Sequence, residues 1–182
     1  IEGIEIMKYI LKNGKEISIR RPVDENEEIF SLIKILSDES DNFPFTSEDF
    51  GLDSRNIGAF ADYLNSRENS VFYIAEADSR IVGLGYLEGG KRARTAHCVN
   101  LGIGVLDEFS NKGIGTAILK ELIRFASEGE YIAKIDLQVK SDNTKAIALY
   151  KKCGFVPEGK TSRALFIDGE FYDSLTMGLI ID

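Results

Sequence analysis

A glycine-rich segment, residues 101–116 (LGIGVLDEFSNKGIGT), contains the residue types that bind phosphate groups. An apolar stretch ending at Val105 predicts a strand, and glycines then lead directly into an amphipathic helical pattern. The first backbone N–H groups of a helix have no partner within it and carry a partial positive charge. Gly113 and Gly115 let the backbone approach an anion, and Lys112 adds a positive charge. We therefore expect a phosphate site where this helix begins.

Two common nucleotide-binding patterns do not fit this segment. It lacks the P-loop pattern G-x-x-x-x-G-K-S/T, because no Ser or Thr follows its lysine. The dinucleotide fingerprint G-x-G-x-x-G fails twice, because Asp107 and Ile118 stand where the last glycine is required. A glycine-rich turn without a ligand is the alternative, but the strand before it and the long helix after it favour a ligand.

A second cluster, residues 141–155 (SDNTKAIALYKKCGF), follows an alternating stretch that predicts a strand. Together the two segments resemble the GNAT superfamily of acyl-CoA-dependent N-acetyltransferases, whose cofactor loop reads R/Q-x-x-G-x-G/A and whose later helix reads N-x-x-A-x-x-L-Y-x-x-x-G-F. The loop pattern is met by Gly113 and Gly115, whereas Ser110 stands at its opening position. The helix pattern is met in full by Asn143, Ala146, Leu149, Tyr150, Gly154 and Phe155.

This resemblance implies a mixed α/β fold: a single domain with a central, mostly antiparallel sheet that splays at the cofactor strand and is flanked by helices. It implies an acyltransferase that moves an acetyl group from acetyl-CoA, its cosubstrate, to a primary amine by direct attack, without a metal. Both a small-molecule amine and a protein N-terminus are left open as the acceptor.

The resemblance also implies where acetyl-CoA binds. Its pantetheine arm is expected along residues 101–105, with Ile103, Gly104 and Val105 as binding residues and Gly102 and Gly104 serving a bulge that splays the strand. A backbone N–H of this stretch is expected to stabilise the developing oxyanion. Asn143 is expected to cap its helix and to contact the pantetheine arm. The diphosphate is expected on Asn111, Lys112, Gly113, Ile114, Gly115 and Thr116.

Tyr150 is the residue expected to act as general acid. A phenol has a pKa near 10, which lets it give a proton to a thiolate leaving group whose conjugate acid lies near that range. Tyr150 also follows Asn143 at the distance that the family pattern requires. A core tyrosine on a buried helix face is the alternative, and the surrounding motif favours the catalytic interpretation.

The general base is left open. Members of the family often carry a glutamate just before the LGIGV stretch, where this chain has Asn100, which takes no proton but can orient a water or the amine. Cys98 and Cys153 lie in apolar patterns, so packing is the preferred interpretation of both. The candidates that remain, acting through water, are Glu76, Glu88, His97, Asp107 and Glu108; a lone histidine at a strand start is more often a polar edge residue.

Acceptor specificity is expected from the segment between the first two helices, which borders the acceptor cleft in the family. Carboxylates interleaved with aromatic rings could attract a cationic amine there, and a solvated acidic loop anchored by aromatic side chains is the alternative. The residues concerned are Asp38, Glu39, Asp41, Glu48, Asp49 and Asp53, with Phe43, Phe45 and Phe50.

Periodicity and turn residues predict the elements that position these groups. An Asn-Gly pair, Asn13-Gly14, predicts an opening hairpin with a type I′ turn. Helices are expected over residues 24–37, 57–67, 113–127 and 144–153, the last ending in a Schellman motif at Gly154 and Phe155. Strands are expected over residues 9–11, 17–19, 71–77, 81–87, 96–105, 135–139, 164–167 and 174–181.

Composition limits the other classes of function. The 182 residues include 22 Lys and Arg against 30 Asp and Glu, a formal net charge of −8. A protein that neutralises nucleic-acid phosphates needs the opposite balance, so no nucleic-acid partner is expected. No apolar run approaches the roughly 20 residues that span a bilayer, so no membrane partner is expected. With 2 Cys and 1 His, we expect no zinc cluster and a cytoplasmic protein.

The organisation of the chain predicts an N-acetyltransferase domain over residues 17–182. Residues 1–16 are interpreted as an N-terminal extension with a hairpin strand, and residues 1–6 as a cloning remnant before Met7. The C-terminal strands offer an edge for a homodimer. Two alternatives to an enzyme stay open: a non-catalytic acyl-CoA sensor, since Asn100 and Ser110 depart from the family pattern, and a structural domain whose glycines only form turns.

Overall fold

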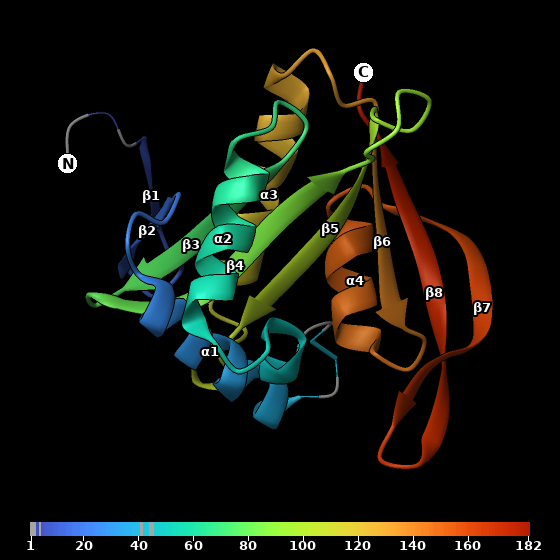
Figure 1. Ribbon diagram of the computed structural model, residues 1–182, viewed down its shortest axis with the longest axis horizontal. Helices are drawn as coiled ribbons and strands as arrows, with labels where there is room; N and C mark the ends of the chain where they lie inside the picture. The colour runs from blue at the N-terminus through green and yellow to red at the C-terminus, as the bar shows by residue number, and fades with distance from the viewer. Residues whose placement is uncertain (1–2, 4, 41, 44–45) are drawn as a thin grey trace.

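A computed structural model describes residues 3, 5–40, 42–43 and 46–182 of the chain. Its strands form one eight-stranded sheet in the order β1-β2-β3-β4-β5-β6-β8-β7 (Figure 1). Neighbouring strands run antiparallel except β5 and β6, which run parallel, so the mixed, mostly antiparallel sheet is confirmed. The strands are β1 (Ile6–Ile10), β2 (Glu16–Arg20), β3 (Val71–Ala77), β4 (Arg80–Gly89), β5 (Cys98–Val105), β6 (Lys134–Lys140), β7 (Val156–Ile167) and β8 (Glu170–Ile180).

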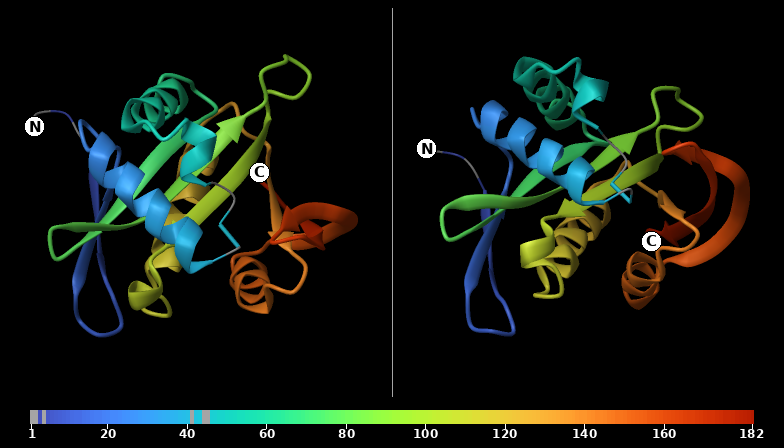
Figure 2. Two further views of the ribbon diagram at one scale, coloured as in Figure 1. Left: turned by 60° about the horizontal axis from the view of Figure 1, so that its bottom comes forward. Right: turned by 90° about the horizontal axis from the view of Figure 1, so that it is seen from below.

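Helices cover both faces of the sheet. Figure 2 shows α1 and α2 on one face and α3 and α4 on the other. Within the described part of the chain, no helix is long and apolar enough to cross a membrane. The helices are α1 (Asn26–Glu39), α2 (Ser54–Asn65), α3 (Ile114–Glu128) and α4 (Thr144–Lys152), with two short 3-10 turns, η1 (Ser47–Phe50) and η2 (Asp107–Phe109).

The opening hairpin forms, but its turn differs from the predicted one. Leu11 N–H bonds to the Lys15 carbonyl at 2.8 Å, so the loop contains Lys12, Asn13 and Gly14. Gly14 has a φ of 81°, whereas Asn13 is not among the residues with positive φ, which a type I′ turn requires at both central positions. The expected type I′ turn is therefore wrong, and the hairpin has a longer loop with glycine in the left-handed position. The proposed domain boundary at residue 17 falls within this hairpin and stays a prediction.

The splay of the sheet lies between β5 and β6. The two strands pair only over Cys98–Asn100 and Lys134–Asp136, and they diverge beyond those residues (Figure 1). On its other side β5 stays in register with β4 from Val99 to Val105. Only one edge of β5 is therefore opened, at the strand where the sequence predicted the cofactor.

The glycines of β5 do not form the expected bulge. Pairing between β4 and β5 runs without a register shift, so no bulge lies at Gly102 or Gly104. A Cβ at Gly102 would lie 2.1 Å from the Tyr86 ring, and a Cβ at Gly104 would lie 2.6 Å from the Phe43 ring. These glycines therefore let two aromatic rings lie directly against the strand.

The ends of α4 follow the predicted local motifs. Phe155 N–H bonds to the Tyr150 carbonyl at 3.1 Å, and Gly154 N–H bonds to the Lys151 carbonyl at 3.1 Å. With Gly154 at a φ of 95°, this is the Schellman ending that the sequence predicts. The buried Phe155 ring lies 5.8 Å from the Tyr150 ring, so the motif fixes Tyr150 against the core.

The last hairpin is longer than the sequence indicates. β7 begins at Val156, whereas the sequence predicted a strand only from residue 164. The first part of the strand escaped prediction because its residues are exposed and show no apolar alternation. Because β7 is the last strand in the order of the sheet, the backbone N–H and C=O groups along its outer edge have no neighbouring strand in the sheet. This is the edge available for the homodimer expected above, which stays a prediction.

Candidate active site

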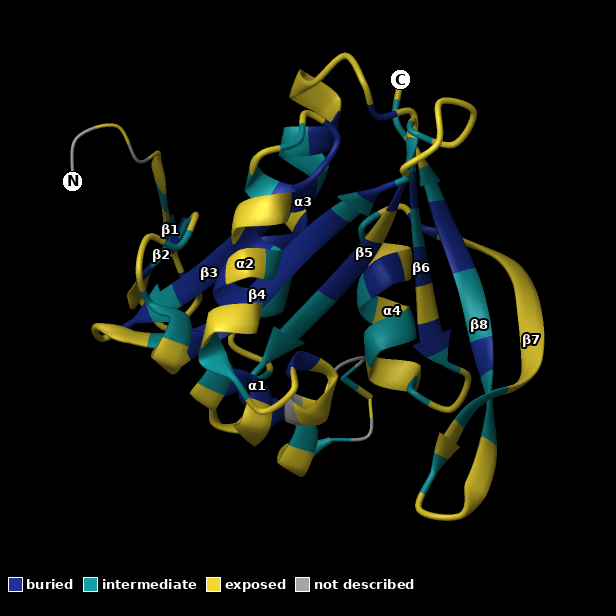
Figure 3. Ribbon diagram, in the orientation of Figure 1, coloured by how far each residue is buried: buried dark blue, intermediate teal, exposed yellow. Residues whose placement is uncertain are grey.

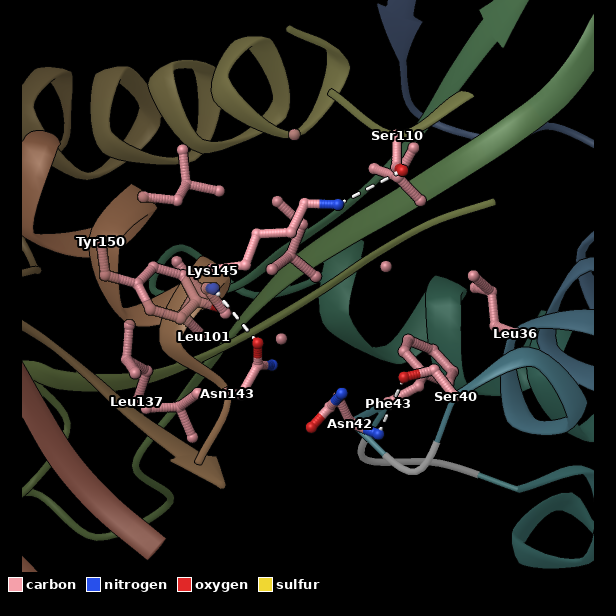
Figure 4. A pocket seen from close by; sticks show the side chains of 18 of the residues that line it. Leu36, Ser40, Asn42, Phe43, Leu101, Ser110, Leu137, Asn143, Lys145 and Tyr150 are labelled. Carbon is pink, nitrogen blue, oxygen red and sulfur yellow. Dashed lines mark hydrogen bonds between the residues drawn. The ribbon is translucent and has the colours of Figure 1, made fainter. Parts of the chain in front are cut away.

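A cavity of about 810 Å³ lies where β5 and β6 diverge. Its walls come from the end of α1 and the segment after it, from β4, β5 and β6, and from the starts of α3 and α4. Figure 4 shows Tyr150 and Asn143 on one side of this cavity and Asn42 and Phe43 on the opposite side. Segments far apart in the sequence therefore meet around the opened edge of β5.

That edge carries backbone groups able to pair with an extended ligand. Leu106 N–H donates to the Val82 carbonyl at 3.0 Å, and hydrogen bonds alternate in direction along an antiparallel strand. Ile103 and Val105 therefore direct their N–H and C=O groups away from β4, into the cavity. Since pairing with β6 ends at Asn100, no β6 strand occupies these groups.

The loop between β5 and α3 also turns its backbone toward the cavity. Asn111 and Gly113 have φ values of 59° and 94°, and the Ala117 N–H bond to the Gly113 carbonyl starts α3 directly afterwards. Gly115 and Thr116, in the first turn of α3, line the cavity with Asn111 and Gly113. Their position at the positive end of a long helix fits a phosphate group.

Two of the predicted cofactor residues lie outside the cavity wall. The Ile114 side chain is fully buried in the core, so only its backbone belongs to the start of α3. The Lys112 ammonium donates to the Glu108 carbonyl at 2.6 Å and lies 5.0 Å from the centre of the Phe109 ring. Its charge is therefore directed toward the loop itself.

Tyr150 is both buried and part of the cavity wall. It is the buried residue of α4 and is 8% exposed. Burial raises the pKa of its phenol to about 12. A phenol with this pKa keeps its proton throughout the neutral range, so its hydroxyl is available there as a hydrogen-bond or proton donor.

Asn143 has the cap position that the sequence predicts. Its side-chain oxygen accepts the Ala146 N–H at 3.2 Å, which satisfies one of the unpaired donors at the start of α4. Asn143 also lines the cavity beside Tyr150. Its contact with the pantetheine arm of acetyl-CoA stays a prediction.

Tyr86 and Asn100 bring polar groups to the face of the sheet that α1 and α2 cover. Tyr86 lies on β4 with its ring stacked at 6.4 Å on Phe72, and it lines the cavity with Asn100. Glu88 is the register partner of Asn100 on the adjacent strand. Burial raises the pKa of the Tyr86 phenol well above its usual value, and the nearby Glu88 and Tyr150 add to this rise. Both phenols and a carboxylate therefore lie near the start of the splay.

The other candidate bases have separate positions. Glu76 is ion-paired to Arg20 at 2.7 Å, and Glu108 to Arg80 at 2.5 Å. His97 precedes β5 at the end away from the splay. Asp107 lines the cavity, but beyond Val105 on the side of the phosphate loop. In the described residues, no group of three or more His, Cys, Asp or Glu is placed to hold a metal ion.

The acidic stretch over residues 38–53 contributes less to the cavity than its composition suggests. Of its carboxylates, Glu39 lines the cavity, whereas Asp49 accepts the Thr46 N–H at 2.7 Å and Asp53 caps α2. Among its aromatic residues Phe43 lines the cavity and Phe50 is buried in the core. Asp41 and Phe45 lie outside the described residues.

Sequence reasoning missed several lining residues, including Lys145, Gln138 and Tyr86. The sequence held one sign that Lys145 has a special position: a cation in the first turn of a helix is unfavourable for the helix dipole. Gln138 and Tyr86 gave none, because alternation alone does not say which strands diverge.

The P-loop pattern, which the glycine-rich segment lacks, does occur at residues 154–161 (GFVPEGKT), contrary to the expectation that it is absent. In the structure this stretch runs from the end of α4 into the exposed strand β7, and no helix follows its lysine. It therefore lacks the strand–loop–helix context that a P-loop needs.

The comparisons with known proteins agree with this geometry. Residues 32–155 match the family model described as the acetyltransferase (GNAT) family. The chain is 29% identical over 170 residues to an N-alpha-acetyltransferase of Sulfurisphaera tokodaii, covering 87% of this chain and 91% of that protein. It is 31% identical over 107 residues to the L-amino acid N-acetyltransferase AaaT of Escherichia coli, covering 59% of this chain and 66% of that protein.

A solved structure shares the fold over most of the chain. The crystal structure of a GNAT-family acetyltransferase from Streptococcus pneumoniae superposes with a TM-score of 0.86 at 27% identity, covering 91% of this chain and 99% of that chain. The family match spans more than half of the chain and contains both predicted motifs. The chain therefore belongs to the GNAT family and is an N-acetyltransferase with acetyl-CoA as its cosubstrate.

Proposed function

We propose that the acceptor is the α-amino group of a protein N-terminus. The carrying observation is the charge of the cavity wall on the side of α1 and β4. On that side the Glu39 carboxylate accepts the Asp107 N–H at 3.0 Å, so two acidic lining residues lie together, whereas the cavity's one basic lining residue in the described chain, Lys145, lies on α4. A free amino acid would bring an α-carboxylate without a cation to pair with it, which is costly in a partly desolvated site. In a peptide that carboxyl group is an amide.

The relatives support an α-amino acceptor. The Sulfurisphaera tokodaii relative, matched over most of both chains, is named an N-alpha-acetyltransferase. The Escherichia coli relative is named for L-amino acids and makes a free amino acid the second candidate. Both names refer to acetylation of an α-amine. The charge of the cavity wall favours a peptide over a free amino acid as the acceptor.

We propose that Tyr150 acts at the sulfur of the thioester. Acetyl-CoA supplies the activated acetyl group. Because the pKa of Tyr150 is raised to about 12, above that of an ordinary thiol near 8.5, the hydroxyl stabilises the departing sulfur mainly through a hydrogen bond. The Ile103 and Val105 N–H groups, which point into the cavity, are proposed to hold the pantetheine arm and to stabilise charge on the carbonyl oxygen.

We propose Glu88 as the group that takes the proton from the amine through water. The phosphate loop follows Val105, so the thioester end of an extended arm lies toward the other end of the splay, near Asn100. Glu88 is the register partner of Asn100 and is half-buried. Asn100 itself, which lines the cavity, is proposed to orient the water or the amine.

Acetylation of a matched series of acceptors tests the proposed function. The series contains free L-alanine, L-alaninamide, spermidine and a peptide beginning with alanine, each assayed by thiol release. We expect kcat/KM to rise from free alanine to the amide to the peptide, because the first step removes the carboxylate and the second adds contacts. Free alanine or spermidine as the best acceptor would contradict the proposal.

Neither the cavity nor the relatives favour a non-catalytic acyl-CoA sensor. Asn100 and Ser110 depart from the family pattern. The groups proposed for catalysis are nevertheless present: the Tyr150 phenol, the opened edge of β5 and the Glu88 carboxylate beside Asn100. Complete absence of acetyl transfer to every amine of the series, with acetyl-CoA bound, would revive that alternative.

A further inference from the structure

Lys145 extends from the first turn of α4 into the cavity. Its ammonium lies 3.3 Å from the Ser110 hydroxyl, which belongs to the loop before α3. Both residues line the cavity, and Figure 4 shows the Lys145 side chain crossing toward Ser110. The amine is therefore held beside the loop that begins the proposed phosphate site.

This position is electrostatically unfavourable in the protein alone. Lys145 follows Thr144, the first residue of α4, so its charge lies near the positive end of the helix dipole. None of the ion pairs found among the described residues includes Lys145. By contrast, Lys151 and Lys152 lie in the last turn of α4, where the dipole favours a cation. The exposed Lys145 side chain thus takes a slightly unfavourable position relative to the dipole of α4, and its contact with Ser110 directs its charge into the cavity.

The surroundings of Lys145 would favour an anion. Across the cavity lie Asn111, Gly113 and Thr116 at the start of α3, so the positive ends of two helices face the same region. Lys112, the cation that the sequence favours, is directed at the Glu108 carbonyl instead. Lys145 is the basic side chain that reaches this region.

We propose that Lys145 binds the diphosphate of acetyl-CoA and supplies, from α4, the charge that the family pattern carries at the position of Ser110. This inference rests on the cofactor placement proposed above and does not depend on the acceptor. Because the Lys145 amine and the Ser110 hydroxyl are neighbours, a cation at either position can reach the same anion.

Binding measurements on the full chain test this inference. Calorimetry compares wild type with Lys145→Gln, using CoA, dephospho-CoA and pantetheine as ligands, and Lys152→Gln as the control lysine of the same helix. We expect Lys145→Gln to weaken CoA and dephospho-CoA about tenfold, the range of one charged hydrogen bond, with pantetheine and the control unchanged. At saturating acetyl-CoA, kcat should be unchanged while KM for acetyl-CoA rises about tenfold.

A rescue variant separates charge from structure. Ser110→Arg in the Lys145→Gln background should restore CoA affinity to within a few-fold of wild type, and Lys145→Arg alone should keep it. Equal weakening of pantetheine would show a structural effect, and loss toward CoA but not dephospho-CoA would place Lys145 at the 3′-phosphate; either result overturns the proposal. The calorimetry contains no acceptor, so its outcome can be interpreted even if the peptide test fails. Wild type that binds no CoA would contradict the cofactor placement itself.

Discussion

The two helices that begin at the cavity, α3 and α4, are fixed in the molecule by different means. α3 buries a continuous stripe against the sheet, whereas α4 buries Tyr150 and leaves most of its surface partly or fully exposed (Figure 3). The buried residues of α3 are Ile114, Ala117, Ile118, Leu119, Glu121, Leu122 and Ala126.

The difference follows from what lies beneath each helix. α3 packs against continuous strands, and a Cβ at Gly85 would lie 2.4 Å from Ile118. α4 lies beside the diverging part of β5 and β6, where a cavity takes the place of a core. We infer that α3 positions the phosphate loop through packing, whereas the side chains of α4 are left for the ligand. Substitutions should therefore affect stability in α3 and chemistry in α4.

Tyr150→Phe should produce the largest effect. Removing the hydroxyl takes away the proposed hydrogen-bond donor to the sulfur, so kcat should fall about 10²- to 10³-fold, the loss typical of removing one preorganised donor to a developing charge. The Kd of acetyl-CoA should stay within twofold. Tyr131→Phe, which alters a phenol that is 52% exposed, serves as the control in the same thiol-release assay. Full turnover of Tyr150→Phe at every pH would refute the assigned role.

Leu122→Ala tests the structural side of the comparison. Leu122 is fully buried in α3, so its truncation should lower the free energy of unfolding by about 3 kcal/mol. Chemical denaturation measures this loss, and kcat per folded molecule should stay unchanged. A large fall in kcat without a loss of stability would show that α3 takes part in the chemistry.

Asn143→Ala sharpens the comparison at the start of α4. Loss of the cap should lower the free energy of unfolding by about 1 kcal/mol. Asp53→Ala, which removes the side-chain cap of α2, should cost a similar amount. Only Asn143→Ala should also raise KM for acetyl-CoA. Equal KM values for both variants would leave Asn143 as a cap alone.

The pH profile of kcat/KM should show the smallest effect. Since burial raises the pKa of Tyr150 to about 12, the donor form persists as pH rises, and its loss begins only above about pH 11. An α-amine with a pKa near 8 becomes nucleophilic as it loses its proton, so activity should rise through that range. A descending limb between pH 9 and 10 that disappears in Tyr150→Phe would contradict the burial of this phenol.

The ends of α4 were predictable from the sequence, whereas the turn type at Asn13-Gly14 and the long-range contacts were not. The cap at Asn143 and the Schellman ending at Gly154 depend on neighbouring residues and follow from residue type. The approach of Lys145 to Ser110 joins residues on different elements, so no periodicity contains it. The polar strand β7 was predicted too short because its exposed residues lack alternation. The splay itself came from the family resemblance.

The central claim is that an extended arm of acetyl-CoA pairs with the opened edge of β5. Amide hydrogen exchange at Ile103 and Val105, measured by NMR with and without saturating acetyl-CoA, tests it most directly. These N–H groups point into the cavity, so we predict clear slowing of their exchange upon binding, while Val99, where β5 pairs with β6, changes little. Acetyl-CoA bound with unchanged exchange at both amides would contradict the account.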